Sequence, residues 1–340
     1  MSKRIAIVGG GISGLAAAFA LEEKRRAGVP VEYVVYEASP RLGGVIVTER
    51  VEGCLVEAGP DSFLTEKPWA AELCRQIGLA DQLIGSNDGQ RKTYIPANGK
   101  LVAMPDGLMF MVPTKILPTV FSPLFSMRTK IRIAGEWFHP PRQARADETV
   151  AELVERHYGA EMVDLLADPL LSGVYGGEAS QLSVRAVLPR FTDMEAKHGS
   201  LGRGMLSARK KMSAAAKGPP APLFSSLKEG MQQLVDALVE RLDAGALHTS
   251  SPVQSVISQD DGWTVSAGYQ SDQFDGLIIA TPAPAASALA VASMSSELAD
   301  PAFERRCQRV LLATFSIRSS LVLPVSYPTV HFDPFGTELL

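Results

Sequence analysis

The sequence predicts an α/β protein in which a parallel sheet is assembled from two distant parts of the chain. Residues 4–8 form a short apolar run that leads into a glycine-rich turn, and residues 15–26 follow with the Ala/Leu pattern of a helix. Residues 31–36 form a second apolar run, so the order is strand, helix, strand. Residues 274–280 are again almost wholly apolar, as expected for a strand in the centre of a parallel sheet. The sheet is therefore expected to be discontinuous in sequence.

The turn after the first strand has the spacing of a dinucleotide-binding loop. Gly9, Gly11 and Gly14 fit the pattern in which glycines permit a tight bend, admit a pyrophosphate and let the helix pack on the strand. The helix N-terminus then faces the phosphates. Glu37 directly follows the second strand, where a carboxylate accepts hydrogen bonds from ribose hydroxyls. The pattern predicts a Rossmann-like site for FAD or NAD rather than NADP, the alternative being a plain βαβ crossover.

A second glycine cluster distinguishes between these two dinucleotides. Arg41, Gly43 and Gly44 lie shortly after Glu37. Paired glycines let backbone amides approach a flavin, and the arginine can neutralise a phosphate. NAD dehydrogenases do not usually have this cluster. The chain here resembles the FAD-dependent superfamily that includes amine oxidases, phytoene desaturases and protoporphyrinogen oxidases, and the resemblance implies FAD.

Later motifs narrow the resemblance to one family. Residues 57–63, 168–178 and 224–231 are similar, in that order, to segments of protoporphyrinogen and coproporphyrinogen oxidases, and the likeness covers residues 4–282. It implies FAD-dependent oxidation of protoporphyrinogen IX or coproporphyrinogen III in haem biosynthesis, with hydride passing to the flavin and dioxygen or another acceptor reoxidising it. The sequence leaves the choice of porphyrinogen open. It also leaves two alternatives, a non-catalytic flavoprotein remnant and a flavin amine oxidase.

The resemblance also implies site residues. Gly173 would let a pyrrole ring or bridge carbon approach the flavin, or it is simply a helix stop. Asp61 either orients the flavin loop or caps the turn after Pro60. We expect no metal and no side-chain acid or base. The implied cofactor contacts are Gly9, Gly11, Ile12, Ser13, Gly14, Glu37, Ala38, Arg41, Gly43, Gly44, Gly59, Pro60, Asp61, Ser62, Val253, Ala280 and Thr281.

The motifs predict three domains. Residues 1–85 and 223–285 form a discontinuous FAD-binding domain, and residues 86–112 and 286–340 form an incomplete substrate-binding domain. Residues 113–222 form a helical insertion, for which contact with a membrane is one interpretation.

Two further segments carry predictions of their own. Residues 149–152 have the pattern of a capping box, whereas residues 196–222 are rich in small and basic residues and are expected to form a solvated loop. The family likeness fades after residues 310–314. We therefore expect a C-terminally truncated chain that retains flavin weakly and exposes a sheet edge and apolar surface.

Composition and targeting signals limit the partners and the location. The net charge of -4 gives no reason to expect nucleic acid. Cys54, Cys74 and Cys307 form no CxxC pair, which suits a reducing cytoplasm and buried structural roles. Residues 5–8 form too short an apolar region for a signal peptide, and no apolar run of about 18 residues follows, so we expect neither a signal peptide nor a membrane span. Residues 101–138 mix apolar, proline and basic residues, which fits peripheral contact with the inner face of a membrane, an apolar substrate channel or short core helices.

Overall fold

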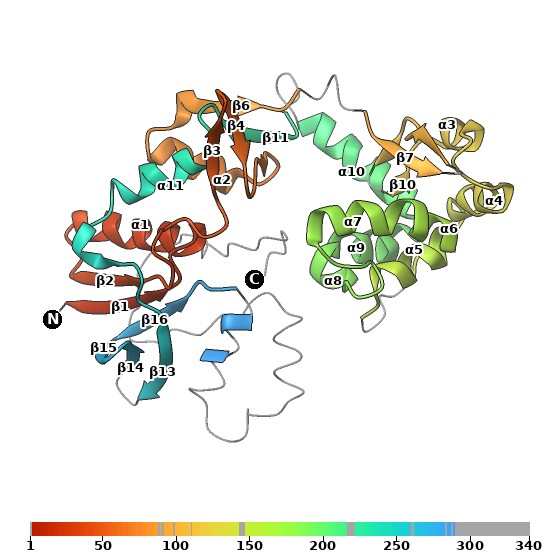
Figure 1. The fold of residues 1–340 in the computed structure, drawn as a ribbon. Coiled ribbons are helices and arrows are strands. Elements are labelled where there is room, and N and C mark those ends of the chain that lie inside the picture. Colours follow the sequence, from red (N-terminus) through yellow and green to blue (C-terminus); the bar gives the residue numbers. More distant parts are fainter. Residues whose placement is uncertain are drawn as a thin grey trace. The chain divides into compact units, whose positions relative to one another are not determined.

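The chain forms two compact units (Figure 1). The computed structural model describes residues 2–87, 89, 92–97, 99–109, 111–142, 147–215, 222–259, 262–282, 284–286 and 288–289. The first unit contains the described residues up to Ser86 and those from 222 onwards, and the second contains those from Asn87 to 215. The division into cofactor-binding, substrate-binding and helical domains stays a prediction.

The first unit is built on a parallel sheet of four strands in the order β12–β2–β1–β16. Its strands are Lys3–Val8 (β1), Val31–Tyr36 (β2), Leu247–His248 (β12) and Gly276–Ile279 (β16). Every neighbouring pair is parallel. β2 and β16 lie on opposite sides of β1, so strands from distant parts of the sequence meet at β1. The predicted α/β, Rossmann-like fold with a discontinuous sheet is confirmed.

Alternation along the strands separates two apolar layers. Ile5 and Ile7 share a core with the helices α1 (Ile12–Arg26) and α11 (Gln232–Val239). Ala6 and Val8 pack instead against an antiparallel sheet of β13 (Val253–Gln259), β14 (Gly262–Ala267) and β15 (Gln270–Phe274). The parallel sheet is therefore covered by helices on one face and by a second sheet on the other.

The predicted strand over residues 274–280 is confirmed for Gly276–Ile279, which pair with β1 in the parallel sheet, but its predicted start is wrong. β15 ends at Phe274 and β16 begins at Gly276, and β16 is an edge strand among those described. Asp275 separates the two strands because its carboxylate accepts hydrogen bonds from Lys3 Nζ (2.7 Å) and from the backbone N–H of Arg4 (2.8 Å). A charge that is held at the sheet end in this way interrupts an otherwise apolar run.

The rest of the first unit consists of short elements. A hairpin joins β3 (Thr48–Val51) to β4 (Cys54–Glu57), and a small sheet has the order β5–β11–β6. The sequence predicts this hairpin with its first strand over residues 45–50; the hairpin is confirmed, but that strand begins only at Thr48, after Gly43 and Gly44, which have positive φ, and after exposed Val45. The remaining elements are β5 (Phe63–Leu64), α2 (Pro68–Gln76), β6 (Leu83–Gly85), β11 (Phe224–Leu227) and the 3-10 turns at Ala80–Gln82 and Ala244–Ala246.

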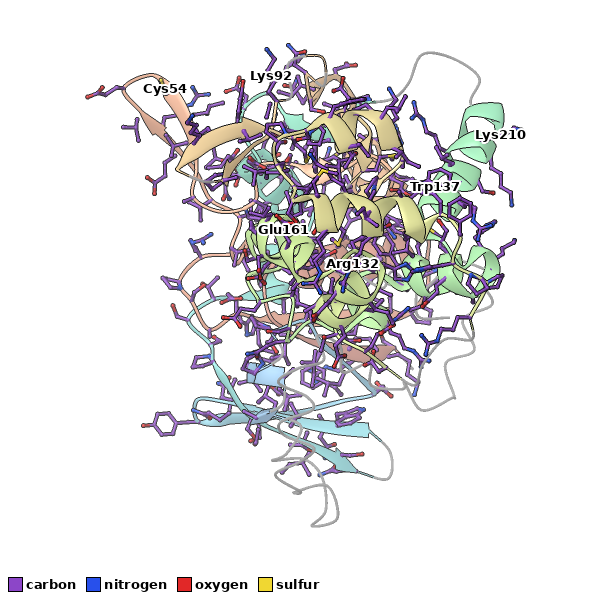
Figure 2. All side chains as sticks on the ribbon, turned by 90° about the vertical axis from the view of Figure 1, so that its right-hand side faces the viewer. Cys54, Lys92, Arg132, Trp137, Glu161 and Lys210 are labelled. Atoms are coloured by element: carbon purple, nitrogen blue, oxygen red, sulfur yellow. The ribbon has the colours of Figure 1, made fainter. Side chains whose placement is uncertain are left out.

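The cysteines differ from each other in environment. Cys74 is fully buried, as predicted, and burial raises its pKa to about 11. Cys54 is exposed near the turn of the β3–β4 hairpin (Figure 2), so a buried role for it was wrong. Its position follows from the exposed Glu52–Gly53 turn, which leaves the hairpin end uncovered. Cys307 lies outside the described residues.

The second unit is mainly helical. Its core contains fully buried Leu153, Tyr158, Met162, Leu166 and Leu201. The elements are β7 (Tyr94–Ala97), β8 (Lys100–Ala103), β9 (Leu108–Met109), β10 (Val112–Pro113), α3 (Ile116–Phe121), α4 (Met127–Glu136), α5 (Val150–Tyr158), α6 (Ala160–Met162), a π-helix (Val163–Ala167), α7 (Asp168–Tyr175), α8 (Val184–Val187), α9 (Pro189–His198) and α10 (Leu201–Ala215). No helix in the described part of the chain is both long and apolar enough to cross a bilayer.

Two sequence predictions in this unit had opposite outcomes. The capping box is confirmed, because Thr149 and Glu152 exchange side-chain to backbone hydrogen bonds at the start of α5. The solvated loop at residues 196–222 is wrong where the structure describes it, since α10 occupies most of that range. Leu201 is buried, and helix-forming Leu, Met, Ala, Arg and Lys outweigh the two glycines of α10. Residues 216–221 lie outside the described residues.

Candidate cofactor site

The first glycine turn lies at the carboxyl end of β1. Gly9 has φ +111°, and a Cβ there would lie 2.7 Å from the carbonyl oxygen of Ala280. A Cβ at Gly14 would lie 1.8 Å from the carbonyl oxygen of Gly9. Packing therefore requires glycine at both positions. Gly11 differs, because a Cβ there would meet only the Cα of Gly44, at 3.9 Å. The space beside Gly11 is open to a ligand.

Helix α1 begins directly after this turn. Gly11 is its N-cap residue, Ile12 and Ser13 lie in its first turn, and no side chain caps it. The first N–H groups of a helix have no partner within the helix, and the helix dipole adds partial positive charge at this end. The end of α1 is therefore suited to an anion such as a pyrophosphate.

Glu37 is held in place by backbone hydrogen bonds. Its Oε2 accepts from the N–H of Gly10 at 2.7 Å, and its Oε1 accepts from the N–H of Ser39 at 2.8 Å. Burial raises the pKa of Glu37, but the hydrogen bonds from Ser39 and Gly10 together lower it by more, so the pKa lies below its ordinary value. The carboxylate is thus ionised at neutral pH, and each oxygen retains a lone pair for a ribose hydroxyl. Ala38, the next residue, is exposed.

The second glycine cluster packs directly on the first. Gly43 has φ +103° and donates its N–H to the carbonyl oxygen of Gly10 at 2.8 Å. Gly44 has φ +59°, and a Cβ there would lie 3.1 Å from the Cα of Gly11. The two glycine clusters that the sequence singled out therefore form one surface.

Arg41 closes the loop that carries this second cluster. Its guanidinium donates to the backbone carbonyl oxygens of Leu42 (3.3 Å) and Ile46 (3.2 Å), and also to that of Gly44. Arg41 therefore supports the conformation of the glycine pair. Its contact with a phosphate stays a prediction.

The predicted flavin loop lies against the segment after the second cluster. A Cβ at Gly59 would lie 1.8 Å from the carbonyl oxygen of Val45, so the two segments touch through backbone atoms. Ser226 Oγ donates to the carbonyl oxygen of Asp61 at 2.6 Å, and Ser62 Oγ donates to Asp61 Oδ1 at 2.7 Å. The side chain of Asp61 thus makes a local contact within its own turn, which supports the turn role over orientation of a flavin.

Three further predicted contacts come from later strands. Ala280 and Thr281 follow directly after β16, and Val253 begins β13. The N–H of Ser251 donates to the carbonyl oxygen of Glu37 at 2.8 Å, which brings the segment before Val253 next to that residue. The hydroxyl of Thr281 is buried and has no hydrogen-bond partner within the described structure. Such an atom normally finds a partner in a ligand or ordered water.

The contacts therefore bring the two glycine clusters, Glu37 and Ala280 together at the carboxyl ends of the parallel strands, whereas the Gly59 loop and Val253 are linked to them indirectly, through Val45 and Ser251. The strand order reverses at β1 there, and open α/β sheets bind their ligands at such a point. The open space at Gly11, the uncapped end of α1 and the buried hydroxyl of Thr281 fit a dinucleotide such as FAD. Pro60, in the flavin loop, is exposed.

Sequence reasoning missed two features of this site. Gly10 was given no role, yet a Cβ there would lie 2.6 Å from Leu42 Cδ2 and 2.9 Å from Glu37 Cβ. The run of three glycines was the signal, because only two of them belong to the dinucleotide pattern. The contacts of Thr48 and Glu57 with the start of α11 were also missed, although Glu57 begins the family-like segment 57–63. The partners are distant in sequence, so no local pattern indicated these contacts.

Gly173 lies in the second unit, on α7, and is exposed. A Cβ at Gly173 would meet no atom within 4 Å. The helix ends instead at Gly176, which has φ +66° and is the left-handed C-cap residue. The helix-stop interpretation therefore belongs to Gly176. The described structure does not require glycine at position 173, and the role of Gly173 beside the flavin stays a prediction.

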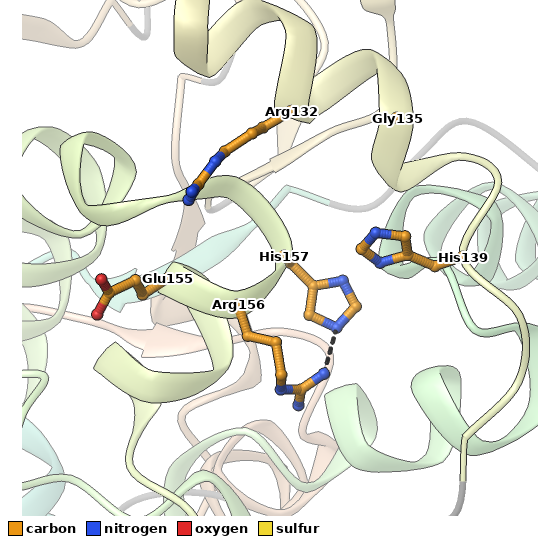
Figure 3. Close-up of a pocket in the computed structure, with 6 residues that line it drawn as sticks. All are labelled: Arg132, Gly135, His139, Glu155, Arg156 and His157. Atoms are coloured by element: carbon orange, nitrogen blue, oxygen red, sulfur yellow. Dashed lines mark hydrogen bonds between the residues drawn. The ribbon is translucent and has the colours of Figure 1, made fainter.

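A polar recess of about 530 Å³ in the second unit was not predicted (Figure 3). His157, at its base, has Nδ1 3.2 Å from Glu136 Oε1 and Nε2 3.4 Å from Glu195 Oε1. Arg156 donates to Glu148 at 2.6 Å and also to Glu195. These contacts join α4, α5 and α9, so the charges serve the packing of the unit. The recess is lined by Arg132, Gly135, His139, Glu155, Arg156 and His157.

The carboxylates of this network are held in their charged form. Burial raises the pKa of Glu136, but the hydrogen bonds from His157 and Ser200 together lower it by more than burial raises it. Burial likewise raises the pKa of Glu195, and the hydrogen bond from Arg156 more than offsets that effect. Both pKa values lie below the ordinary value, so the ionised forms stabilise the folded second unit.

A family model described as flavin containing amine oxidoreductase matches residues 12–330. The chain belongs to this family. Membership confirms the prediction of a flavin cofactor within the amine oxidase superfamily. Family membership agrees with the geometry of the first unit, in which two glycine clusters form one open surface at the carboxyl end of β1.

Individual relatives are more specific. The chain is 35% identical to coproporphyrinogen III oxidase of Bacillus subtilis (strain 168), over 87% of this chain and 62% of that protein. It is 31% identical to coproporphyrinogen III oxidase of Propionibacterium freudenreichii, over 97% of this chain and 64% of the relative. The chain thus spans less than two thirds of the length of these relatives.

Solved structures agree on the fold. A candidate protoporphyrinogen oxidase from Exiguobacterium sp. 255-15 is 30% identical with a TM-score of 0.73, covering 88% of this chain and 64% of that one. Cyclohexylamine oxidase from Brevibacterium oxydans IH-35A is 19% identical with a TM-score of 0.57, covering 85% of this chain and 60% of that one. The second likeness shows the fold alone.

Proposed function

We propose that this chain carries the FAD site of a porphyrinogen oxidase of haem biosynthesis, which oxidises coproporphyrinogen III or protoporphyrinogen IX to the porphyrin. The observation that carries the proposal is the 35% identity to a coproporphyrinogen III oxidase over 87% of this chain. The open glycine surface and the buried, unpartnered hydroxyl of Thr281 support it. Dioxygen or another acceptor would regenerate the oxidised flavin.

The residues present suit this chemistry. When bound, the flavin supplies a two-electron acceptor for hydrogen that leaves a bridge carbon of the substrate. The chain needs to bind, orient and exclude water rather than to supply a nucleophile. The end of α1 and the space at Gly11 suit the pyrophosphate, and Glu37 suits the ribose. Gly173 leaves room for a flat ring to approach.

Purified protein tests this proposal in two steps. FAD is first added to the chain and its binding is followed by flavin absorbance. Coproporphyrinogen III, protoporphyrinogen IX and a simple amine are then added separately without oxygen. We expect a porphyrinogen to bleach the bound flavin and the amine to leave it oxidised. Bleaching of the flavin by the amine alone would favour an amine oxidase. A chain that shows no bound-flavin absorbance after FAD has been added would favour a non-catalytic remnant.

We also infer that α3 and α4 contact an anionic membrane surface. Five large apolar side chains of this segment are exposed by two thirds or more: Leu117 (70%), Phe121 (81%), Met127 (68%), Ile131 (67%) and Phe138 (86%). Lys115, Arg128 and Lys130 lie among them in the sequence. Apolar side chains beside cations suit the boundary between lipid headgroups and acyl chains. Some apolar side chains of residues 101–138 are buried in the core and others are exposed to solvent. The alternative prediction of short core helices therefore explains the buried side chains but not the exposed ones.

Vesicle sedimentation tests the membrane contact. We expect the chain to bind vesicles that contain anionic lipid more strongly than neutral vesicles. The double variant Phe121→Ser/Phe138→Ser should bind at least about tenfold more weakly, since one buried large apolar side chain contributes roughly 1.5–3 kcal/mol. Tyr269→Ser removes a fully exposed aromatic ring from the first unit and is the matched control. Equal binding by the double variant and the control would contradict the inference.

A further inference from the structure

A carboxylate that is not among the predicted cofactor contacts holds together the segments around the candidate FAD site. Glu57 ends β4 and lies opposite Thr48 in the β3–β4 hairpin. Thr48 Oγ1 donates to Glu57 Oε2 at 2.7 Å, and Glu57 Oε1 accepts from the N–H of Met231 at 2.8 Å. Thr48 Oγ1 also accepts from the N–H of Gln232 at 2.9 Å. The hairpin thus binds the start of α11.

This arrangement replaces the usual local cap of α11. Met231, its N-cap residue, provides no side-chain cap, and the hairpin supplies partners for the N–H groups of Met231 and Gln232. A carboxylate at a helix N-terminus is also favoured by the helix dipole. Gly230 permits the close approach: it has φ +90°, and a Cβ there would lie 2.2 Å from Thr48 Cγ2 and 2.8 Å from Glu57 Oε1.

Both sides of this contact lead to predicted cofactor residues. Within α11, Val235 lies 3.0 Å from the position that a Cβ would take at Gly43. Directly after Glu57 the chain enters the flavin loop, where Gly59 packs against the carbonyl oxygen of Val45. The same carboxylate is therefore connected to the second glycine cluster through α11 and to the flavin loop through β4.

We propose that Glu57 is a positioning residue for the flavin. By binding Thr48 and the start of α11, it fixes the spacing between Gly43 and the Gly59 loop, which must both be in place for one cofactor to contact them. Glu57 needs no contact with the cofactor to have this effect. The inference rests on the proposed FAD site and adds a residue that is not among the predicted cofactor contacts.

The test compares FAD binding by the wild-type chain, Glu57→Ala and Glu49→Ala. Glu49 is the matched control, because it lies on the same hairpin, is exposed and carries the same charge. FAD affinity and the absorbance and fluorescence of the bound flavin are measured together with the thermal unfolding midpoint. We expect Glu57→Ala to weaken FAD binding roughly tenfold to hundredfold, as expected for hydrogen bonds to a charged group, and to change the bound-flavin spectrum. Glu49→Ala should match the wild type.

The readouts separate positioning from a purely structural role. Loss of stability alone would lower the folded fraction without altering the spectrum of the flavin that is bound. Glu57→Gln, which keeps the size and one acceptor oxygen, gives the same test if Glu57→Ala does not fold, and we expect it to lose roughly threefold to tenfold in affinity. Wild-type affinity and spectrum in a folded Glu57 variant would overturn this inference alone. A wild-type chain that binds no FAD would overturn the proposed function and this inference with it.

Discussion

Replacement of Gly14 by alanine should lower the stability of the first unit, whereas replacement of Gly11 by alanine should chiefly weaken FAD binding. A Cβ at Gly14 would lie 1.8 Å from the carbonyl oxygen of Gly9, whereas real contacts begin near 3.0 Å. Backbone must therefore move, and overpacking of this kind costs about 3 kcal/mol. The better helix propensity of alanine offsets up to about 1 kcal/mol. The net loss of about 2 kcal/mol lowers the thermal unfolding midpoint of the first unit by roughly 4–8 °C.

Gly11→Ala is the matched variant, because its Cβ enters open space. Alanine is a poorer N-cap residue than glycine, so we expect a loss of only about 0.5–1 kcal/mol, or roughly 1–4 °C. Its effect should appear in FAD binding, which weakens at least about tenfold because the methyl group fills the space needed by the pyrophosphate.

Circular dichroism melts without FAD and fluorescence titration with FAD measure the two effects on the same samples. Gly14→Ala should lower the melting midpoint, and Gly11→Ala should chiefly lower the affinity. The reasoning is refuted if Gly11→Ala binds FAD as the wild type does, or if Gly14→Ala melts at the wild-type temperature.

Two other predictions concern the second unit. Because the pKa values of Glu136 and Glu195 lie below their ordinary value of 4.5, their stabilisation is fully present above about pH 5 and is lost as the pH falls through the folded values. Urea unfolding between pH 3 and pH 7 should show this loss of stability. Glu136→Gln should have a smaller free energy of unfolding than wild type at pH 7, and this free energy should fall less on acidification. Parallel pH profiles of the free energy of unfolding in the two proteins would count against the network. Gly173→Val should leave the melting midpoint and FAD affinity near wild type but slow flavin reduction by porphyrinogen at least about tenfold, roughly 1.4 kcal/mol of barrier. Gly176→Val is the control and should mainly lower stability, since Gly176 has φ +66°; unchanged reduction by Gly173→Val would remove the pocket role.

Local chemistry explains which parts of the site the sequence predicted. Gly14 is required by a contact with Gly9 inside one strand–turn–helix unit, so the spacing of the two glycines indicated the turn. The contact of Gly9 with Ala280 is long-range and was not needed for that prediction. Glu37 likewise follows its strand directly and binds the N–H of Gly10. Features of this kind depend on few residues that are close in sequence, and pattern reasoning identifies them well.

Long-range contacts explain what the sequence did not predict. The bond from Met231 to Glu57 joins residues 174 positions apart. Both lie at an end of a family-like segment, 224–231 and 57–63, but neither segment indicates a contact with the other. Asp275 was placed inside a strand because its neighbours are apolar, but its bonds to Lys3 and Arg4 end that strand. The helix α10 was predicted as a loop because of its glycine, serine and basic residues, but its helix-forming residues and the burial of Leu201 outweigh the two glycines. The first two of these examples depend on partners that are distant in sequence.

The central claim is that the glycine surface of the first unit holds FAD for porphyrinogen oxidation, and one measurement tests it most directly. The chain is loaded with FAD, freed of oxygen and mixed with coproporphyrinogen III while the flavin and porphyrin absorbance bands are followed together. We predict that the flavin band of the wild-type chain bleaches as the porphyrin band appears. The FAD concentration is chosen well below the dissociation constant of Gly11→Ala, and neither absorbance band should then change in that variant. A flavin that binds to the wild-type chain and stays oxidised in the presence of porphyrinogen would contradict the claim.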